Sequence, residues 1–177
     1  MFGFGKRNCR KDELFMSLSR TVDENTTAEQ REKMMAGSNL VSMQIGLAFN
    51  LLRNGDVASQ LSDEEFKFFM IIILQGINEA MYENIDVSNE VKTNAFVFVI
   101  SDGYKNFANI FNYYVEDVLR IFEKISLISS EEWVQNTFKE GKKIWAKLSE
   151  NSGDMMPIAD IFENKDLVMN VKKVDLS

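Results

Sequence analysis

Histidine is absent from all 177 residues of the chain, and cysteine occurs once, as Cys9. Without histidine the chain lacks the most common protein ligand of zinc, haem and di-iron centres, and neither a Ser-His-Asp nor a Cys-His catalytic group can form. One cysteine excludes an internal disulfide and a cysteine-built metal site. The sequence therefore predicts no cofactor, no metal and no enzymatic activity.

Long apolar runs are also missing. The longest, Phe68–Leu74, has seven residues, whereas a helix needs about twenty to cross a bilayer. Basic residues near the N-terminus are typical of the start of a signal peptide, but no apolar stretch follows them, because acidic residues intervene from Asp12 onward. We expect a cytoplasmic protein with no transmembrane segment.

Few residues interrupt the backbone, since there is one proline, Pro157, and nine glycines. This scarcity favours long helices over many short strands. Three capping boxes, in which a hydroxyl residue precedes a Gln or Glu by three positions, mark expected helix starts. They are Thr27 with Gln30, Ser62 with Glu65, and Ser129 with Glu132.

Apolar residues at helical spacing predict helices over residues 28–53, 63–82, 104–126 and 131–149. Two segments are also compatible with strands. Phe68–Leu74 is rich in Ile and Phe, and Val and Phe alternate in Ala95–Ile100. Helix is favoured for both, and the strand alternative stays open.

These elements predict a compact all-α domain, a bundle of about five helices. Residues 1–25 are expected to form a basic N-terminal arm, with or without a short helix, and residues 26–153 the helical core. Residues 154–177 contain apolar side chains but no clear cap, so they are expected to form a loosely docked C-terminal tail.

The net charge of −7 combines segments of opposite sign. Residues 1–11 contribute +4, so residues 12–177 hold 16 basic and 27 acidic residues and carry −11. An acidic body argues against nucleic-acid binding, which needs a continuous basic face. Near the end of the chain, Lys139, Lys143 and Lys147 recur every four residues and form one ridge of a helix. This ridge is a candidate contact with an acidic partner or with another copy.

The N-terminal segment combines aromatic and basic residues, namely Phe2, Phe4, Lys6, Arg7, Arg10 and Lys11. Such a segment is a candidate for weak peripheral membrane contact or anion binding. The alternative is a solvated terminus whose cations aid solubility. A second candidate surface is the polar-aromatic pair Asn112 and Tyr113, because tyrosine combines apolar area with a hydrogen-bonding tip.

Carboxylate clusters are the only acid–base groups left to the chain. The clusters Asp63–Glu65 and Glu131–Glu132 fall in the first turn of expected helices, where the helix dipole favours negative charge without any catalytic role. Enzymatic use of a divalent metal is therefore the least favoured hypothesis. The favoured one is a non-enzymatic acidic helical interaction protein, of inhibitor, immunity or adaptor type, that binds a protein partner or itself. The alternative is a carrier or sensor for an apolar ligand, suggested by the fourteen Phe and ten Met residues.

Overall fold

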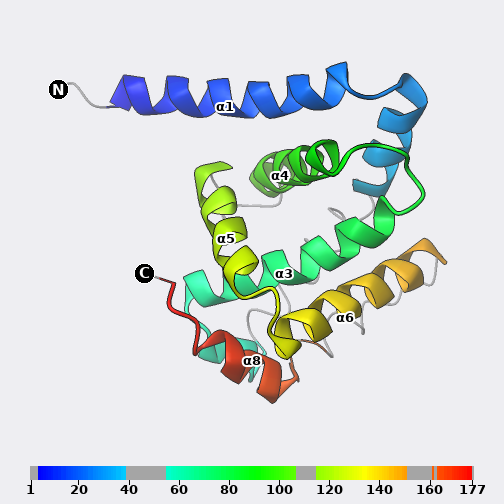
Figure 1. The fold of residues 1–177 in the computed structure, drawn as a ribbon. Helices are drawn as coiled ribbons and strands as arrows, with labels where there is room; N and C mark the ends of the chain where they lie inside the picture. Colours follow the sequence, from blue (N-terminus) through cyan, green and yellow to red (C-terminus); the bar gives the residue numbers. More distant parts are fainter. Residues whose placement is uncertain (1–3, 39–54, 107–114, 151–160, 162, 177) are drawn as a thin grey trace.

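The computed structural model describes residues 4–38, 55–106, 115–150, 161 and 163–176, with the backbone alone described for 4–12, 99, 101–106 and 115 (Figure 1). All regular structure within these ranges is helical. A helical segment covers residues 28–38. The other helices are α1 (Phe4–Glu24), the short 3-10 helix η1 (Ala58–Gln60), α3 (Asp63–Met81), α4 (Asn89–Asn106), α5 (Val115–Leu127), α6 (Glu132–Ser149) and α8 (Lys165–Val171).

The all-α prediction is confirmed for these ranges, and both ambiguous segments are helical. Phe68–Leu74 lies in α3 and Ala95–Ile100 in α4. The expected single helix over residues 104–126 is wrong, because Tyr104 belongs to α4 while Val115 begins α5, which runs in a different direction (Figure 1). Apolar spacing alone did not distinguish two helices from one.

The centre of the core is α3. Its residues from Phe68 to Leu74 are all buried, and a helix that is apolar all round is stable only when neighbours cover every side. Helix α6 packs across α3, with α4, α5 and α8 also against it (Figure 1). The α3–α6 crossing occurs at Gly76 and Gly141, where the two backbones approach each other directly.

The N-terminal arm expected over residues 1–25 contains a long helix rather than a short one. Helix α1 has 21 residues and packs on α4. Leu18 is buried in the main core, and the ring of Phe15 stacks on Phe98 with 4.6 Å between centroids. The second half of α1 is therefore part of the folded body.

Two of the three capping boxes are present. The Thr27 amide donates to the Gln30 side chain while the Gln30 amide donates to the Thr27 hydroxyl, and Ser62 with Glu65 forms the same reciprocal pair. The third is wrong, because α6 begins after Glu131 and the Ser129 hydroxyl donates to the Ser126 carbonyl.

The C-terminal residues are packed more firmly than the sequence suggested. Leu167, Val168 and Val171 of α8 are buried in the main core, as is Ile161. Asn164 caps α8, since its side chain accepts hydrogen bonds from the amides of Asp166 and Leu167. None of the helices in the described ranges is both long enough and apolar enough to span a membrane.

Candidate functional site

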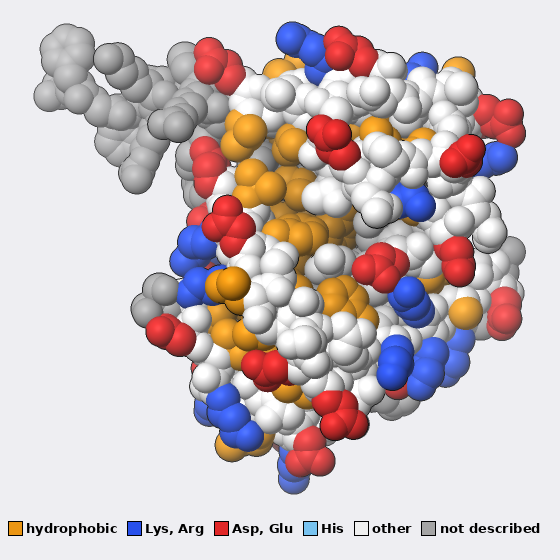
Figure 2. Space-filling view, viewed as in Figure 1, with side chains coloured by type: hydrophobic (Ala, Val, Ile, Leu, Met, Phe, Trp, Pro, Cys, Tyr) orange, Lys and Arg blue, Asp and Glu red, His pale blue; other side chains and the backbone are white. Residues whose placement is uncertain are grey.

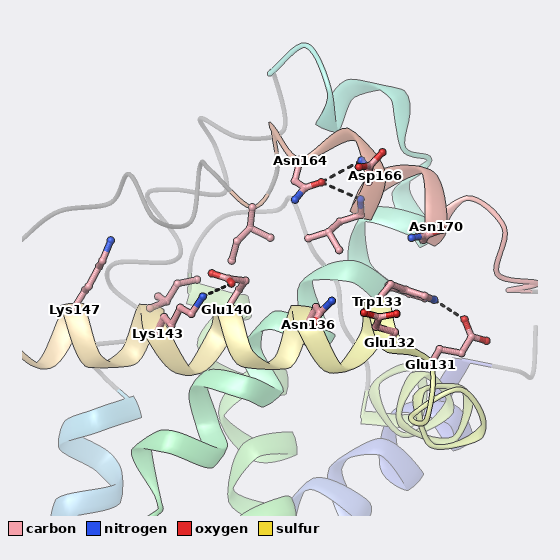
Figure 3. Close-up of a pocket in the computed structure, with 13 residues that line it drawn as sticks. Glu131, Glu132, Trp133, Asn136, Glu140, Lys143, Lys147, Asn164, Asp166 and Asn170 are labelled. Carbon is pink, nitrogen blue, oxygen red and sulfur yellow. Dashed lines mark hydrogen bonds and ion pairs between the residues drawn. The ribbon is translucent and has the colours of Figure 1, made fainter.

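A surface groove of about 1040 Å³ runs between α6 and residues 161–170 (Figure 3). Helix α6 forms one wall along its length, and the segment around α8 forms the other. Ile144, Ile161 and Leu167 supply the apolar part of the lining. The polar part consists of Glu131, Glu132, Asn136, Glu140, Lys143, Lys147, Asn164, Asp166 and Asn170, with Trp133 beside them.

Trp133 also borders a second hollow, of about 400 Å³, between the end of α5 and the C-terminal residues. Its indole N–H donates to the Glu131 carboxylate over 2.5 Å (Figure 3). The second hollow is more apolar than the groove, because its lining includes Leu127, Ile128 and Val174. We call the residues that line the two hollows the Trp133 surface.

Leu127 is the most solvent-exposed of the large apolar side chains described, with 84% of its surface exposed. It is the last residue of α5, just before the chain turns into α6. A single exposed leucine needs no special explanation. Here, however, it borders a hollow that already contains an indole ring, so the apolar area is contiguous.

Three carboxylates at the Trp133 end of the groove have no Lys or Arg partner among the described residues: Glu131, Glu132 and Asp166. The helix dipole stabilises negative charge at these positions, since Glu131 and Glu132 begin α6 and Asp166 lies in the first turn of α8. Ion pairs do occur elsewhere, as between Glu79 and Lys142 at 3.0 Å. The Trp133 end of the groove therefore holds three carboxylates that form no ion pair with any residue the structure describes.

The predicted lysine ridge is exposed on α6, where basic side chains gather in the view of Figure 2. Lys143 and Lys147 line the groove at the end away from Trp133, and Lys139 does not (Figure 3). Lys143 is paired with Glu140, which lies one turn earlier, at 2.5 Å. The ridge therefore carries less free positive charge than its sequence suggests.

Several other predicted site residues cannot be placed. Phe2, Asn112 and Tyr113 lie outside the described residues. Phe4, Lys6, Arg7, Arg10 and Lys11 belong to α1 by their backbone, and their side chains are not described.

Within the described ranges, no three carboxylate or thiolate side chains come close enough to hold one metal ion. The clusters at Asp63–Glu65 and Glu116–Asp117 occupy the first turns of α3 and α5. Helix electrostatics therefore accounts for these carboxylates.

Sequence reasoning missed Trp133 and the wall formed by Asn164, Asp166 and Asn170. The available signal was Asn164, because asparagine is a preferred N-cap and Leu167, Val168 and Val171 follow it at helical spacing. That pattern indicates the helix α8 but not its position against α6. Comparisons with known protein families, characterised proteins and solved structures find no significant match to this chain.

Proposed function

We propose that the protein is a non-enzymatic interaction module that binds protein through the Trp133 surface. The observation that carries the proposal is the position of Trp133, which lines both neighbouring hollows together with Glu131 and Asn170. Tryptophan is among the residues that contribute most to binding energy at protein interfaces, especially where a pocket lies beside it.

The composition of the Trp133 surface supports a macromolecular partner. Protein interfaces combine an apolar centre with a polar rim that remains hydrated. Here Leu127, Trp133 and Val174 supply apolar area, while the carboxylates, the lysines and three asparagines surround it. The asparagine amides add donors and acceptors that can pair with a partner's backbone.

The charge of the molecule supports the same proposal. An acidic body attracts basic partners over long range, which raises the association rate and disfavours acidic competitors. A basic partner bound at the Trp133 surface would contact the carboxylates of Glu131, Glu132 and Asp166 directly. Binding through this surface should therefore weaken as ionic strength rises.

Capture from native lysate tests the proposal by comparing variants. Leu127→Glu places a charge on an 84% exposed position and should remove a bound protein without unfolding the chain. Trp133→Ala should do the same, with circular dichroism confirming that the helices remain. Met35→Ser is the matched control, because Met35 is 64% exposed on the segment 28–38 and does not line either hollow. Equal recovery of the same proteins by all four chains, wild type included, would contradict the proposal.

A further inference from the structure

We infer that the Trp133 surface binds the basic N-terminal segment, residues 1–11, of a second copy of this chain. The inference rests on the proposed function, since it names the partner of the same surface. It joins two features: three carboxylates that have no Lys or Arg partner among the described residues, and a segment whose sequence holds four basic residues and no acidic one.

Charge complementarity is the first argument. Residues 1–11 contain Lys6, Arg7, Arg10 and Lys11 and no acidic residue, so this segment is the most basic part of an otherwise acidic chain. Lys6 and Arg10 are four residues apart, as are Arg7 and Lys11, and this spacing puts positions on one side of a helix. Helix α1 includes all four positions. A cationic helix side can therefore meet the carboxylates of Glu131, Glu132 and Asp166.

Apolar complementarity is the second argument. Phe2 and Phe4 precede the cations in the sequence. The hollow beside the carboxylates is lined in part by Lys124, Lys173 and Asp175, and it also offers the apolar side chains of Leu127, Ile128, Trp133 and Val174. Aromatic rings buried against such side chains are favourable contacts, and an arginine over the indole adds a cation–π attraction. In the segment the aromatic residues come first and the basic residues follow. The aromatic residues would enter the smaller, more apolar hollow, and the basic residues would reach the carboxylates of the groove beside Trp133.

The contact must join different copies. Residues Leu14, Phe15 and Leu18 anchor α1 to the core, and α1 packs on α4. Helices α1 and α8 lie on opposite sides of the molecule (Figure 1), so the start of α1 lies on the side opposite its own groove. Each copy thus offers one basic segment and one Trp133 surface. Such a head-to-tail contact links copies into chains whose length grows with concentration.

Sedimentation velocity of the full chain tests the inference, with reductant present so that Cys9 cannot cross-link copies. We expect the mean mass to rise with protein concentration at low salt and to fall towards the monomer at high salt. The fourfold reversal Lys6→Glu, Arg7→Glu, Arg10→Glu and Lys11→Glu should weaken association by about tenfold or more, because several ion pairs are lost together.

The triple substitution Glu131→Gln, Glu132→Gln and Asp166→Asn neutralises the carboxylates of the groove. It should weaken self-association as the fourfold reversal does. The matched control is Glu32→Gln, Glu83→Gln and Glu90→Gln, which removes the same charge at three exposed positions away from both hollows. Because the control leaves the contact intact, it should change association by less than about twofold.

Mixing two defective chains gives the decisive result. The reversed chain keeps its carboxylates, and the neutralised chain keeps its basic segment, so one productive contact remains possible between them. We expect each to be monomeric alone and the mixture to form pairs that grow no further. Absence of pairs in the mixture would overturn the inference.

Two further outcomes would also overturn it. The chain could stay monomeric at low salt while lysate capture depends on Leu127, which would leave the proposed function intact and give the surface another partner. Alternatively, the fourfold reversal could abolish binding to anionic lipid vesicles yet leave the oligomeric state unchanged, which would assign the basic segment to membranes.

Discussion

Gly76 in α3 and Gly141 in α6 lie against each other where the two helices cross. A Cβ atom built on Gly141 would lie 3.0 Å from the Gly76 Cα and closer still to the Ile73 carbonyl oxygen, and one built on Gly76 would collide with the Phe138 carbonyl oxygen. The obstructing atoms are backbone atoms of well-packed helices, which cannot move aside cheaply. The two glycines therefore set the distance between the principal helices of the core.

Replacing either glycine by alanine should destabilise the protein. In an exposed helix the change would stabilise it by up to about 1 kcal/mol, because alanine is the better helix former. At this crossing the added methyl forces the helices apart, and overpacking of this kind costs roughly 1–3 kcal/mol. We expect Gly76→Ala and Gly141→Ala each to lower the free energy of unfolding measured by urea denaturation.

Gly37 provides the comparison. A Cβ there would meet the Met81 side chain, with its sulfur at 2.5 Å, and a methionine can adopt another rotamer. Gly37→Ala should therefore cost less than either substitution at the crossing. If all three variants lost the same stability, backbone contact at the crossing would not be the cause.

The helix caps give a second prediction. The hydroxyls of Thr27 and Ser62 accept hydrogen bonds from amides that have no helical partner, so Thr27→Ala and Ser62→Ala should each cost about 1 kcal/mol. Ser129 caps no helix, and Ser129→Ala should change stability by less than about 0.5 kcal/mol. Chemical denaturation of the three variants measures these changes in the free energy of unfolding. If Ser129→Ala lowered it as much as Ser62→Ala, the assigned start of α6 would be contradicted.

These examples show which features local sequence can predict. Ser62 with Glu65 needed only neighbouring residues to cap α3, and the apolar composition of Phe68–Leu74 indicated its burial. Ser129 failed because the link between α5 and α6 is short, and its hydroxyl bonds to Ser126 in the preceding helix.

The candidate site depends on contacts between distant segments, which spacing does not encode. Trp133 and Asp166 are 33 positions apart and become neighbours of one groove only when α8 docks beside α6. The lysine ridge could be predicted because its three members share one helix. The ion pair between Lys143 and Glu140 also lies within α6, whereas the pairing of the neighbouring Lys142 with Glu79 on α3 is a contact that the pattern within α6 could not reveal.

Tyr82 gives a prediction about alkaline pH. Its side chain is fully buried beside Ser38, with 3.4 Å between the hydroxyl oxygens, and burial raises the pKa of Tyr82 to about 12. The unfolded chain ionises this phenol near its ordinary pKa of 10, so between pH 10 and 12 the folded state binds more protons than the unfolded state. The free energy of unfolding should therefore fall as pH rises through this window, by about 2–3 kcal/mol from Tyr82 alone.

Tyr82→Phe isolates that contribution from the other tyrosines and the lysines. At pH 8 the variant should differ from the wild type by about 1 kcal/mol or less, because the hydrogen bond to Ser38 is long. Above pH 10 its stability should decline less steeply than that of the wild type. Urea denaturation at several pH values measures both slopes, and parallel slopes would show that Tyr82 does not hold its proton in the folded state.

Val171 tests whether the C-terminal residues belong to the core. Its side chain is fully buried at the end of α8, whereas Met169 on the same helix is 49% exposed. Truncating a buried valine removes apolar contacts and leaves a small cavity, so Val171→Ala should cost roughly 1–3 kcal/mol. Met169→Ala should change stability by less than about 0.5 kcal/mol, because its contacts are mostly with water. If both substitutions were neutral in urea denaturation, α8 would be dispensable to the core, and the wall that it gives to the groove would not be fixed against α6.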